Sequence, residues 1–319
     1  MAKIDIAIPN YQYGEYIPDC IKSVLQQGVS DLRVLIIDNA STDDSVDVAR
    51  SLIEIDPRIS LRVHEKNLGM HASLNEAVDW ASGKYFLILC ADDILTPGFL
   101  QRSIELMDQN PRTSFCYGSE VPFKTKDPLP KLPQLTQPTA RIERGVDFIE
   151  ARYLEAERRI SCGTVLVRTD MQKLAGHYRA ELGVTTDLEL LLRLALFGDV
   201  IFSNGVHAYR RLHSLNYSSP MQSDRTNELV LRAAALRSFI NGEGRSLANA
   251  AALHKRMKKR LAARAYWWGV RDLFERRWHD AATCLRYAVG LSPLTTIVPP
   301  FDFLFRAEGP IVRQFSRTA

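Results

Sequence analysis

The chain has 319 residues, of which 46% are hydrophobic and 24% charged, and its formal net charge is +4. This is the composition of a folded globular protein, long enough for one large domain with an appendage or for two domains. The mildly positive charge fits an anionic ligand or surface, and we expect no nucleic-acid partner. The five cysteines are odd in number and show no CxxC spacing, which argues against a disulfide framework or a zinc site and favours a reducing compartment.

Targeting and membrane signals are weak in this sequence. The N-terminal segment has no charged-then-apolar leader before the first strand pattern, so we expect no signal peptide. No stretch approaches the roughly 20 apolar residues that a membrane span needs. These features predict a cytoplasmic protein, which could still lie on the inner face of the cell membrane.

The first part of the chain alternates strand and helix patterns. Apolar runs typical of strands occupy residues 4–8, 33–38, 59–63 and 84–89, and helix-period stretches occupy residues 15–27, 43–54 and 69–81. This order predicts an α/β fold with a mostly parallel sheet flanked by helices, in which ligands bind beyond the carboxyl ends of the strands. Polar residues that follow three of the strands should therefore converge on one crevice: Pro9, Asn10, Tyr11, Asp38, Asn39, Asp92 and Asp93.

The middle of the chain is less regular. A Pro-, Lys- and Thr-rich stretch at residues 121–139 predicts a long surface loop. Residues 162–170 then predict a strand. Residues 185–199 predict a helix, with Thr186 and Glu189 as a capping box at its start.

From about residue 222 the pattern is helical only, which predicts an α/β domain over residues 1–220 and an α-helical extension over residues 221–319. A basic cluster in the extension comprises His254, Lys255, Arg256, Lys258, Lys259 and Arg260. This cluster fits anionic lipid headgroups or a lipid-pyrophosphate acceptor, and it fits a solvated helix face about equally well. Trp267 and Trp268 are expected in the core between the helices, with an interfacial belt at a membrane surface as the alternative.

Four segments carry the functional signal, namely IPNYQYGEYIPDCIKSVLQQ, VLIIDNASTDDS, NLGMHASLNEAVDWASGKYFLILCADDILTPGFL and TTDLELLLRLALFG. In this order and spacing they resemble the successive motifs of the inverting glycosyltransferases of family 2, which have the GT-A fold. The resemblance covers roughly residues 3–215, with no counterpart for the Pro-rich stretch. It implies an enzyme that moves a sugar from a nucleotide-diphosphate sugar, usually a uridine one, to an acceptor hydroxyl. It also implies a glycan or lipid-linked acceptor in polysaccharide, lipopolysaccharide or other cell-surface glycan synthesis.

The adjacent residues Asp92 and Asp93 resemble the family's metal-binding motif. The resemblance implies that Asp93 binds Mn²⁺ or Mg²⁺ and that Asp92 contacts the ribose, the sugar or the metal; carboxylate oxygens suit both ions. Cys90 stands where many members have a further Asp, so the pair would hold the metal without it. From spacing alone, the pair fits a polar turn that caps the next helix equally well. His213 resembles a histidine that some relatives place near the metal, and it fits a surface histidine as well.

Asp38 and Asn39 resemble an acidic pair that accepts a hydrogen bond from the imide N–H of the base, and Asn39 can accept through its amide oxygen. Uracil and thymine both offer that N–H, so the pair does not separate them. The segment DNASTDDS also fits a cap on the following helix. Two further segments resemble donor-binding segments of the family: Pro9, Asn10 and Tyr11 along the base and ribose, and Asn67, Gly69 and Asn75 in an N-x-G…N helix. Tyr11 also fits ordinary packing, and Gly69 an ordinary helix-entry turn.

Asp187 resembles the catalytic base, which takes a proton from the acceptor hydroxyl as that oxygen attacks the anomeric carbon. Arg193 follows six residues later, as an Arg commonly does in the family motif. The position of Asp187 near a helix start also fits a carboxylate that complements the helix dipole. A nucleotide-sugar-binding protein without turnover is the alternative function. A nucleotidyltransferase and a Rossmann dehydrogenase are disfavoured, because neither a Gly- and Arg-rich phosphate loop nor GxGxxG follows the first strand.

Overall fold

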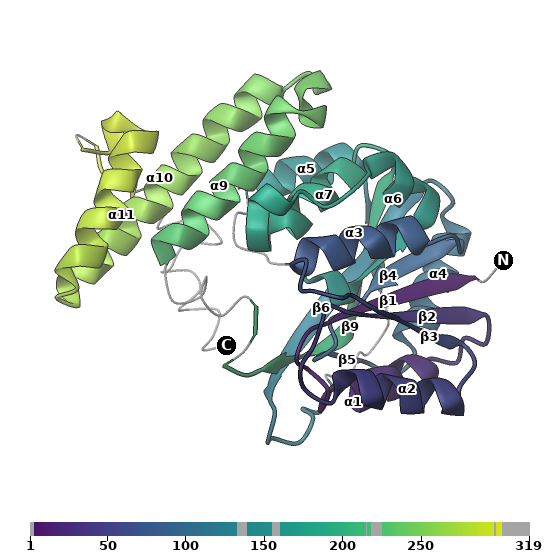
Figure 1. Ribbon diagram of the computed structural model, residues 1–319. Helices are drawn as coiled ribbons and strands as arrows, with labels where there is room; N and C mark the ends of the chain where they lie inside the picture. Colours follow the sequence, from purple (N-terminus) through teal and green to yellow (C-terminus); the bar gives the residue numbers. More distant parts are fainter. Residues whose placement is uncertain are drawn as a thin grey trace. The chain divides into compact units, whose positions relative to one another are not determined.

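The structure is a computed structural model, and it describes residues 3–132, 139–154, 160–214, 216–217, 225–296 and 298–301 (Figure 1). The chain divides into two compact units. The first comprises Met1–Phe148, Arg159–Glu181 and Leu190–Asn216, and the second comprises Ile149–Arg158, Leu182–Glu189 and Tyr217–Ala319. The domain division expected at residue 220 stays a prediction.

A mixed sheet of nine strands forms the centre of the first unit within the described ranges. Its strands are β1 (Ile4–Asn10), β2 (Leu32–Asp38), β3 (Ile59–Val63), β4 (Tyr85–Ile88), β5 (Ile94–Leu95), β6 (Thr113–Lys124), β7 (Ala140–Glu143), β8 (Val165–Arg168) and β9 (Asp199–Leu212). The order is β3-β2-β1-β4-β8-β6-β9-β5, and β7 pairs with β9. Strands β3, β2, β1 and β4 are parallel neighbours, so their carboxyl ends lie at one edge of the sheet. The predicted α/β fold is confirmed.

Helices cover both faces of this sheet, and Figure 1 shows α1 and α2 on one side and α3 on the other. The helices of the first unit are α1 (Ile17–Leu25), α2 (Ser45–Ile55), α3 (Met70–Trp80), α4 (Phe99–Gln109) and α6 (Thr169–Ala175). Helices α5 (Gly145–Leu154) and α7 (Thr186–Leu194) have residues in both units. In α1 the buried residues Ile17, Ile21 and Val24 recur at helical spacing, which places them on one face toward the core. The apolar periodicity of the sequence therefore located the helices that flank the parallel strands.

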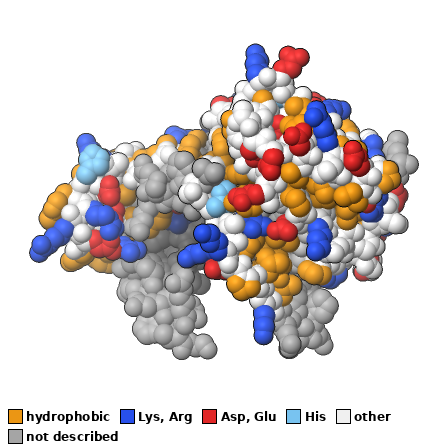
Figure 2. Space-filling view, turned by 60° about the horizontal axis from the view of Figure 1, so that its bottom comes forward, with side chains coloured by type: hydrophobic (Ala, Val, Ile, Leu, Met, Phe, Trp, Pro, Cys, Tyr) orange, Lys and Arg blue, Asp and Glu red, His pale blue; other side chains and the backbone are white. Residues whose placement is uncertain are grey.

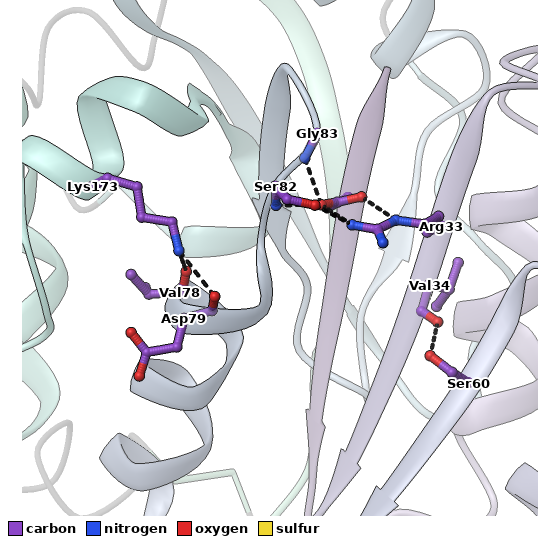
Figure 3. A network of polar contacts seen from close by, with 9 residues as sticks. Arg33, Val34, Ser60, Val78, Asp79, Ser82, Gly83 and Lys173 are labelled. Atoms are coloured by element: carbon purple, nitrogen blue, oxygen red, sulfur yellow. Dashed lines mark hydrogen bonds and ion pairs between the residues drawn. The ribbon is translucent and has the colours of Figure 1, made fainter. Parts of the chain in front are cut away.

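A buried carboxylate ties two strands of the sheet to the turn before β4 (Figure 3). Asp5 on β1 is fully buried and pairs with Arg33 on β2 at 2.6 Å. It also accepts hydrogen bonds from the backbone N–H groups of Ser82 and Gly83, each at 2.7 Å. Burial opposes ionisation of Asp5, but the hydrogen bonds from Arg33 and from these two N–H groups outweigh it, so the pKa of Asp5 is lowered. The turn before β4 is thereby fixed against β1 and β2.

Several predicted boundaries are wrong. Strand β6 extends to Lys124, so the first four residues of the predicted surface loop are in the sheet. The predicted strand at residues 162–170 is a short 3-10 turn (Cys162–Thr164), then β8, then the start of α6. Helix α7 ends at Leu194, and the predicted capping box is absent, because the buried hydroxyl of Thr186 has no hydrogen-bond partner.

The second unit is helical, as predicted for the C-terminal part, with α9 (Arg225–Asn241), α10 (Ala250–Phe274) and α11 (Trp278–Leu291). Helices α10 and α11 approach closely at Gly269, where an added Cβ would lie 2.7 Å from the Leu285 side chain. Trp267 and Trp268 are half-buried, so the prediction that they lie in the core is only partly met. None of the helices in the described part of the chain is long and apolar enough to cross a membrane.

Candidate functional site

The carboxyl ends of β1 and β2 are joined by side chains. Asn10 and Asp38 are register partners in the parallel pair, and Asn10 Nδ2 donates to Asp38 Oδ2 at 2.7 Å. Asp38 Oδ1 accepts from the backbone N–H of Ser41 at 2.8 Å, so each oxygen of this carboxylate has a partner within the chain. Asn10 Oδ1, by contrast, is buried without a hydrogen-bond partner. At this edge of the sheet, the amide oxygen of Asn10, next to Asp38, is therefore an acceptor without a hydrogen-bond partner.

The loop after β1 is held against the loop after β2. Gln12 has a positive φ of 62°, and its backbone N–H donates to Ser41 Oγ at 2.9 Å. Its side chain donates to Thr42 Oγ1 at 2.7 Å and accepts from the N–H of Asp43. Tyr11 is 43% exposed beside this bonded pair of loops. Its ring is available to a ligand, because it is not packed into the core.

Asn39 and Asn67 build the next part of the edge. Asn39 Nδ2 donates to Asn67 Oδ1 at 2.9 Å, and Asn39 Oδ1 accepts from the N–H of Leu68 and lies 2.9 Å from His64 Nδ1. Asn67 Oδ1 also accepts from the N–H of Gly69 at 2.8 Å. The amide of Asn39 is thus used to hold the segment that enters α3.

Gly69 and Asn75 shape α3 in different ways. Gly69 has φ 85° and ψ 157° at the start of the helix, a conformation that L side chains rarely adopt. Asn75 accepts from the N–H of Tyr178 at 2.7 Å and donates to its carbonyl at 3.0 Å. These bonds attach the segment after α6 to α3, so Asn75 has a structural role whether or not it contacts a ligand.

Asp92 and Asp93 follow β4 and are both buried, at 7% and 4% exposure. Asp92 Oδ2 accepts from Asn216 Nδ2 at 2.8 Å and lies 3.0 Å from His213 Nε2. Asp93 Oδ1 accepts from the backbone N–H of Arg211 at 3.0 Å. Burial and the neighbouring charge of Asp92 raise the pKa of Asp93 well above its usual range. Two buried carboxylates side by side form a site that a bound cation would compensate.

The end of β9 brings three residues to the acidic pair. Arg211 is buried, donates to the carbonyl of Asp92 at 3.0 Å and pairs with Asp19 at 3.2 Å. Its guanidinium lies over the rings of Tyr16 and Phe123, at 4.7 and 4.8 Å from their centroids. The guanidinium of Arg211 thus bonds the backbone carbonyl of Asp92 and the carboxylate of Asp19. His213 and Asn216 contact the carboxylate of Asp92 directly.

His213 is packed rather than exposed, which excludes the surface-histidine alternative. Its side chain is 9% exposed, and its ring lies 5.2 Å from Tyr13 and 5.0 Å from Tyr16. Its Nδ1 is buried without a hydrogen-bond partner. The fold therefore brings Asp92, Asp93 and His213 together, as the sequence predicted.

Cys90 also lies in this group, although the sequence suggested that the acidic pair would act without it. One potential ligand atom from each of Cys90, Asp92 and Asp93 falls within 4.8 Å of the others. Cys90 Sγ lies 3.6 Å from Cys162 Sγ, and this contact, followed by burial, raises the pKa of Cys90 well above its usual range.

Asp187 belongs to the second compact unit, where it is the second residue of α7 and is partly exposed. Arg193, on the last turn of the same helix, belongs to the first unit and is buried. It donates to the carbonyls of Ala175 and His177 and so fixes the backbone after α6. The role of Asp187 stays a prediction.

Sequence reasoning missed Arg211, Asn216 and Cys162. Their positions depend on β9 and on the antiparallel pairing of β8, neither of which the sequence patterns indicated clearly. A short polar signal was present, since residues 210–216 combine two arginines, a histidine and an asparagine directly after an apolar stretch.

Solved structures with the same fold support the overall assignment. S. aureus TarS in complex with UDP-GlcNAc matches with a TM-score of 0.59 and 15% identity, covering 92% of this chain and 92% of that one. The mannosyltransferase PcManGT of Pyrobaculum calidifontis, in complex with GDP-Man and Mn²⁺, matches with a TM-score of 0.56 and 15% identity, covering 92% of this chain and 87% of that one. The fold is therefore that of the GT-A glycosyltransferases.

Sequence comparison gives the family. The model of glycosyl transferase family 2 matches residues 5–180, more than half of the chain. An uncharacterized glycosyltransferase of Nostoc sp. is 38% identical over 104 residues, which are 33% of this chain and 32% of that protein. The putative teichuronic acid biosynthesis glycosyltransferase TuaG of Bacillus subtilis is 32% identical over 104 residues, 33% of this chain and 41% of that protein. The matched segment spans about a third of the length of such relatives. The chain therefore belongs to glycosyltransferase family 2.

Proposed function

We propose that the protein transfers a sugar from a UDP-type nucleotide sugar to an acceptor hydroxyl, with inversion at the anomeric carbon. The acceptor would be a polysaccharide, a lipopolysaccharide or another cell-surface glycan, or a lipid-linked precursor of one. Family membership supports sugar transfer, and TarS with UDP-GlcNAc supports a uridine donor. PcManGT with GDP-Man marks guanosine donors as the alternative to be tested.

The observation that carries this proposal is the buried acidic pair at the end of β4. A carboxylate pair in this position is costly unless a cation compensates it. Asp93 and Asp92 would hold Mn²⁺ or Mg²⁺, with His213 at the same metal, since hard oxygen ligands suit these ions and phosphates complete their coordination. When bound, the metal would stabilise the negative charge that develops on the departing diphosphate.

The nucleoside would lie at the carboxyl ends of β1 and β2. The imide N–H of the base would be accepted at Asp38, whose neighbour Asn10 has a buried amide oxygen without a hydrogen-bond partner. Pro9 and the exposed Tyr11 would line the base and ribose. Asn39, Asn67 and Gly69 would hold the loop beside them, and Asn75 would keep α3 in place.

Asp187 would act as the catalytic base. A partly exposed carboxylate can reach an acceptor that arrives from solvent, and an ionised carboxylate can take the proton of the attacking hydroxyl.

We also propose that the enzyme works in the cytoplasm, bound peripherally to the inner face of the membrane. Lys255, Arg256, Lys258 and Lys259 on α10 are exposed. Figure 2 shows basic side chains mixed with acidic and hydrophobic ones at the surface of the C-terminal part. Each basic residue near an anionic bilayer contributes about 1 kcal/mol of attraction. A lipid-linked acceptor would be presented at that surface.

Release of the nucleotide tests this function directly. Purified protein would be incubated with UDP-, TDP- and GDP-linked sugars, Mn²⁺ and a mixture of glycan acceptors, and the free nucleotide diphosphate would be measured. We expect release from uridine donors that increases with acceptor. Nucleotide binding without any release would instead support a nucleotide-sugar-binding protein. In competition assays CDP should be weaker than UDP and TDP by roughly tenfold to a hundredfold, because cytosine lacks the imide proton.

A further inference from the structure

Two cysteines that are distant in the sequence meet beside the acidic pair. Strands β4 and β8 are antiparallel, with Tyr85 opposite Arg168 and Phe86 opposite Val167. Continuing this register places the residues after β4 opposite those before β8, and Cys90 Sγ accordingly lies 3.6 Å from Cys162 Sγ. Neither cysteine forms a disulfide, and both residues are partly exposed.

The turn that contains Cys162 packs directly against the carboxylates. An added Cβ on Gly163 would lie 3.8 Å from Asp93 Oδ2 and 3.2 Å from the Leu89 side chain. Cys90 Sγ in turn falls within 4.8 Å of a carboxylate oxygen of both Asp92 and Asp93. Cys90 thus shares the end of β4 with both carboxylates, and the sulfur of Cys162 lies beside the sulfur of Cys90.

We propose that Cys90 and Cys162, together with Asp93 and Asp92, bind a thiophilic divalent cation such as Zn²⁺. Two thiolates about 2.3 Å from a tetrahedral zinc ion are separated by about 3.8 Å, close to the 3.6 Å observed. A disulfide would need an S–S distance of about 2.05 Å. The sulfur atoms are therefore spaced for a shared metal, although the linear spacing of the cysteines argued against a zinc site.

This inference concerns the carboxylates that the proposed function assigns to the donor's metal, and to that extent it rests on that function. Thiolates favour Zn²⁺ over Mg²⁺, which requires oxygen ligands. Binding replaces the two thiol protons by one metal ion, so two protons are released to solvent and no oxidant or reductant is needed. The cysteine at position 90 would thus shift the metal preference of this site toward softer ions.

Cadmium titration tests the site, because a cadmium–thiolate bond absorbs in the ultraviolet. Cd²⁺ would be added to reduced, metal-free protein in excess Mg²⁺. We expect an absorption band that saturates at one equivalent. Cys90→Ser and Cys162→Ser should each lower the band by about half and weaken Cd²⁺ binding by roughly tenfold or more. Asp93→Asn should weaken binding and keep the band, and Cys284→Ser, which alters a buried cysteine of the second unit, should behave like the parent protein.

Alkylation of the unmodified protein gives a second readout that needs no variant. Zn²⁺, and not Mg²⁺, should protect Cys90 and Cys162 from iodoacetamide, as mapped by peptide mass spectrometry. The proposal is overturned if no band forms at one equivalent, if both serine variants keep the full band, or if Zn²⁺ leaves both thiols reactive.

The same samples separate this inference from the proposed function. A normal cadmium band in a protein that binds no nucleotide would contradict the function and leave the thiol site standing. Normal binding of UDP with Mn²⁺ in a protein without the band would contradict the thiol site alone.

Discussion

A carboxylate that takes a proton during catalysis contributes mainly in the transition state, and Asp187 is the residue to which this applies. Asp187→Asn keeps the shape of the side chain but cannot accept a proton at neutral pH. We expect transfer to fall by about 10²–10⁴, while the affinities for UDP and for metal change little. Steady-state kinetics and calorimetry on the same preparation measure both. Near-normal transfer would place the base elsewhere, and a joint loss of donor binding would place Asp187 in the donor site.

Asp5 shows how one buried charge can control stability. Its pKa is lowered in the folded protein, so its contribution is complete above the unfolded pKa of about 3.9 and is lost as pH falls through the folded value. Asp5→Asn should lower the free energy of unfolding by about 2–4 kcal/mol at neutral pH, and the difference from the parent protein should shrink below about pH 4. Urea titrations across this range measure it.

The matched control for Asp5 is Asp47→Asn, which removes an exposed ion pair with Arg50. Exposed pairs contribute little, so this change should stay within about 0.5 kcal/mol at every pH. A pH-independent loss in Asp5→Asn would show that the charge of Asp5 is not what holds the turn before β4.

Among the elements, α3 depends on one glycine. Gly69→Ala introduces a Cβ into open space but at φ 85°, so only backbone strain opposes it. We expect a destabilisation of about 1–3 kcal/mol. The neighbouring Leu68 is 51% exposed, and Leu68→Ala should change stability by less than about 0.5 kcal/mol. Equal stability of the two variants in urea would show that the segment before α3 adapts without strain.

The elements also show what the sequence could reveal. Strands β1 to β4 and helices α1 to α3 follow simple periodicities, so the parallel part of the sheet and the acidic pair at its edge were predictable. Strand β9 was not, because Ser203, Asn204 and Gly205 interrupt its apolar alternation like turn residues. In the structure these three residues remain within β9, at an irregularity where the register with β6 shifts between Tyr117 and Ser119.

The missed strand explains the missed site residues. Arg211 reaches the acidic pair only because β9 runs beside β6 and β5, and Cys162 reaches Cys90 only through the pairing of β4 with β8. Such contacts between distant segments are set by tertiary pairing, and no local pattern specifies them. Asp38 is a further example, since the sequence could not show that Asn10 and Ser41 each donate a hydrogen bond to one of its oxygens.

At the scale of the whole molecule, the basic face of α10 predicts binding to anionic membranes. The protein should sediment with anionic vesicles at low salt, be released near physiological or higher salt, and ignore neutral vesicles. Changing three exposed lysines to glutamate should abolish sedimentation: Lys255, Lys258 and Lys259. The same change at three exposed lysines of the first unit should not: Lys22, Lys66 and Lys126. If both triple variants lose sedimentation equally, the net charge of the protein and not the basic face of α10 explains the binding.

The central claim is that Asp92 and Asp93 hold the metal that binds the donor's diphosphate. Calorimetric titration of UDP into the protein, with Mn²⁺ and with EDTA, tests it most directly. For the parent protein and for the exposed control Asp47→Ala, we expect UDP to bind roughly tenfold or more tightly with Mn²⁺, a gain of at least about 1.4 kcal/mol. Asp93→Ala should remove that gain while the protein stays folded. Equal UDP affinity in Mn²⁺ and in EDTA for the parent protein would contradict the claim.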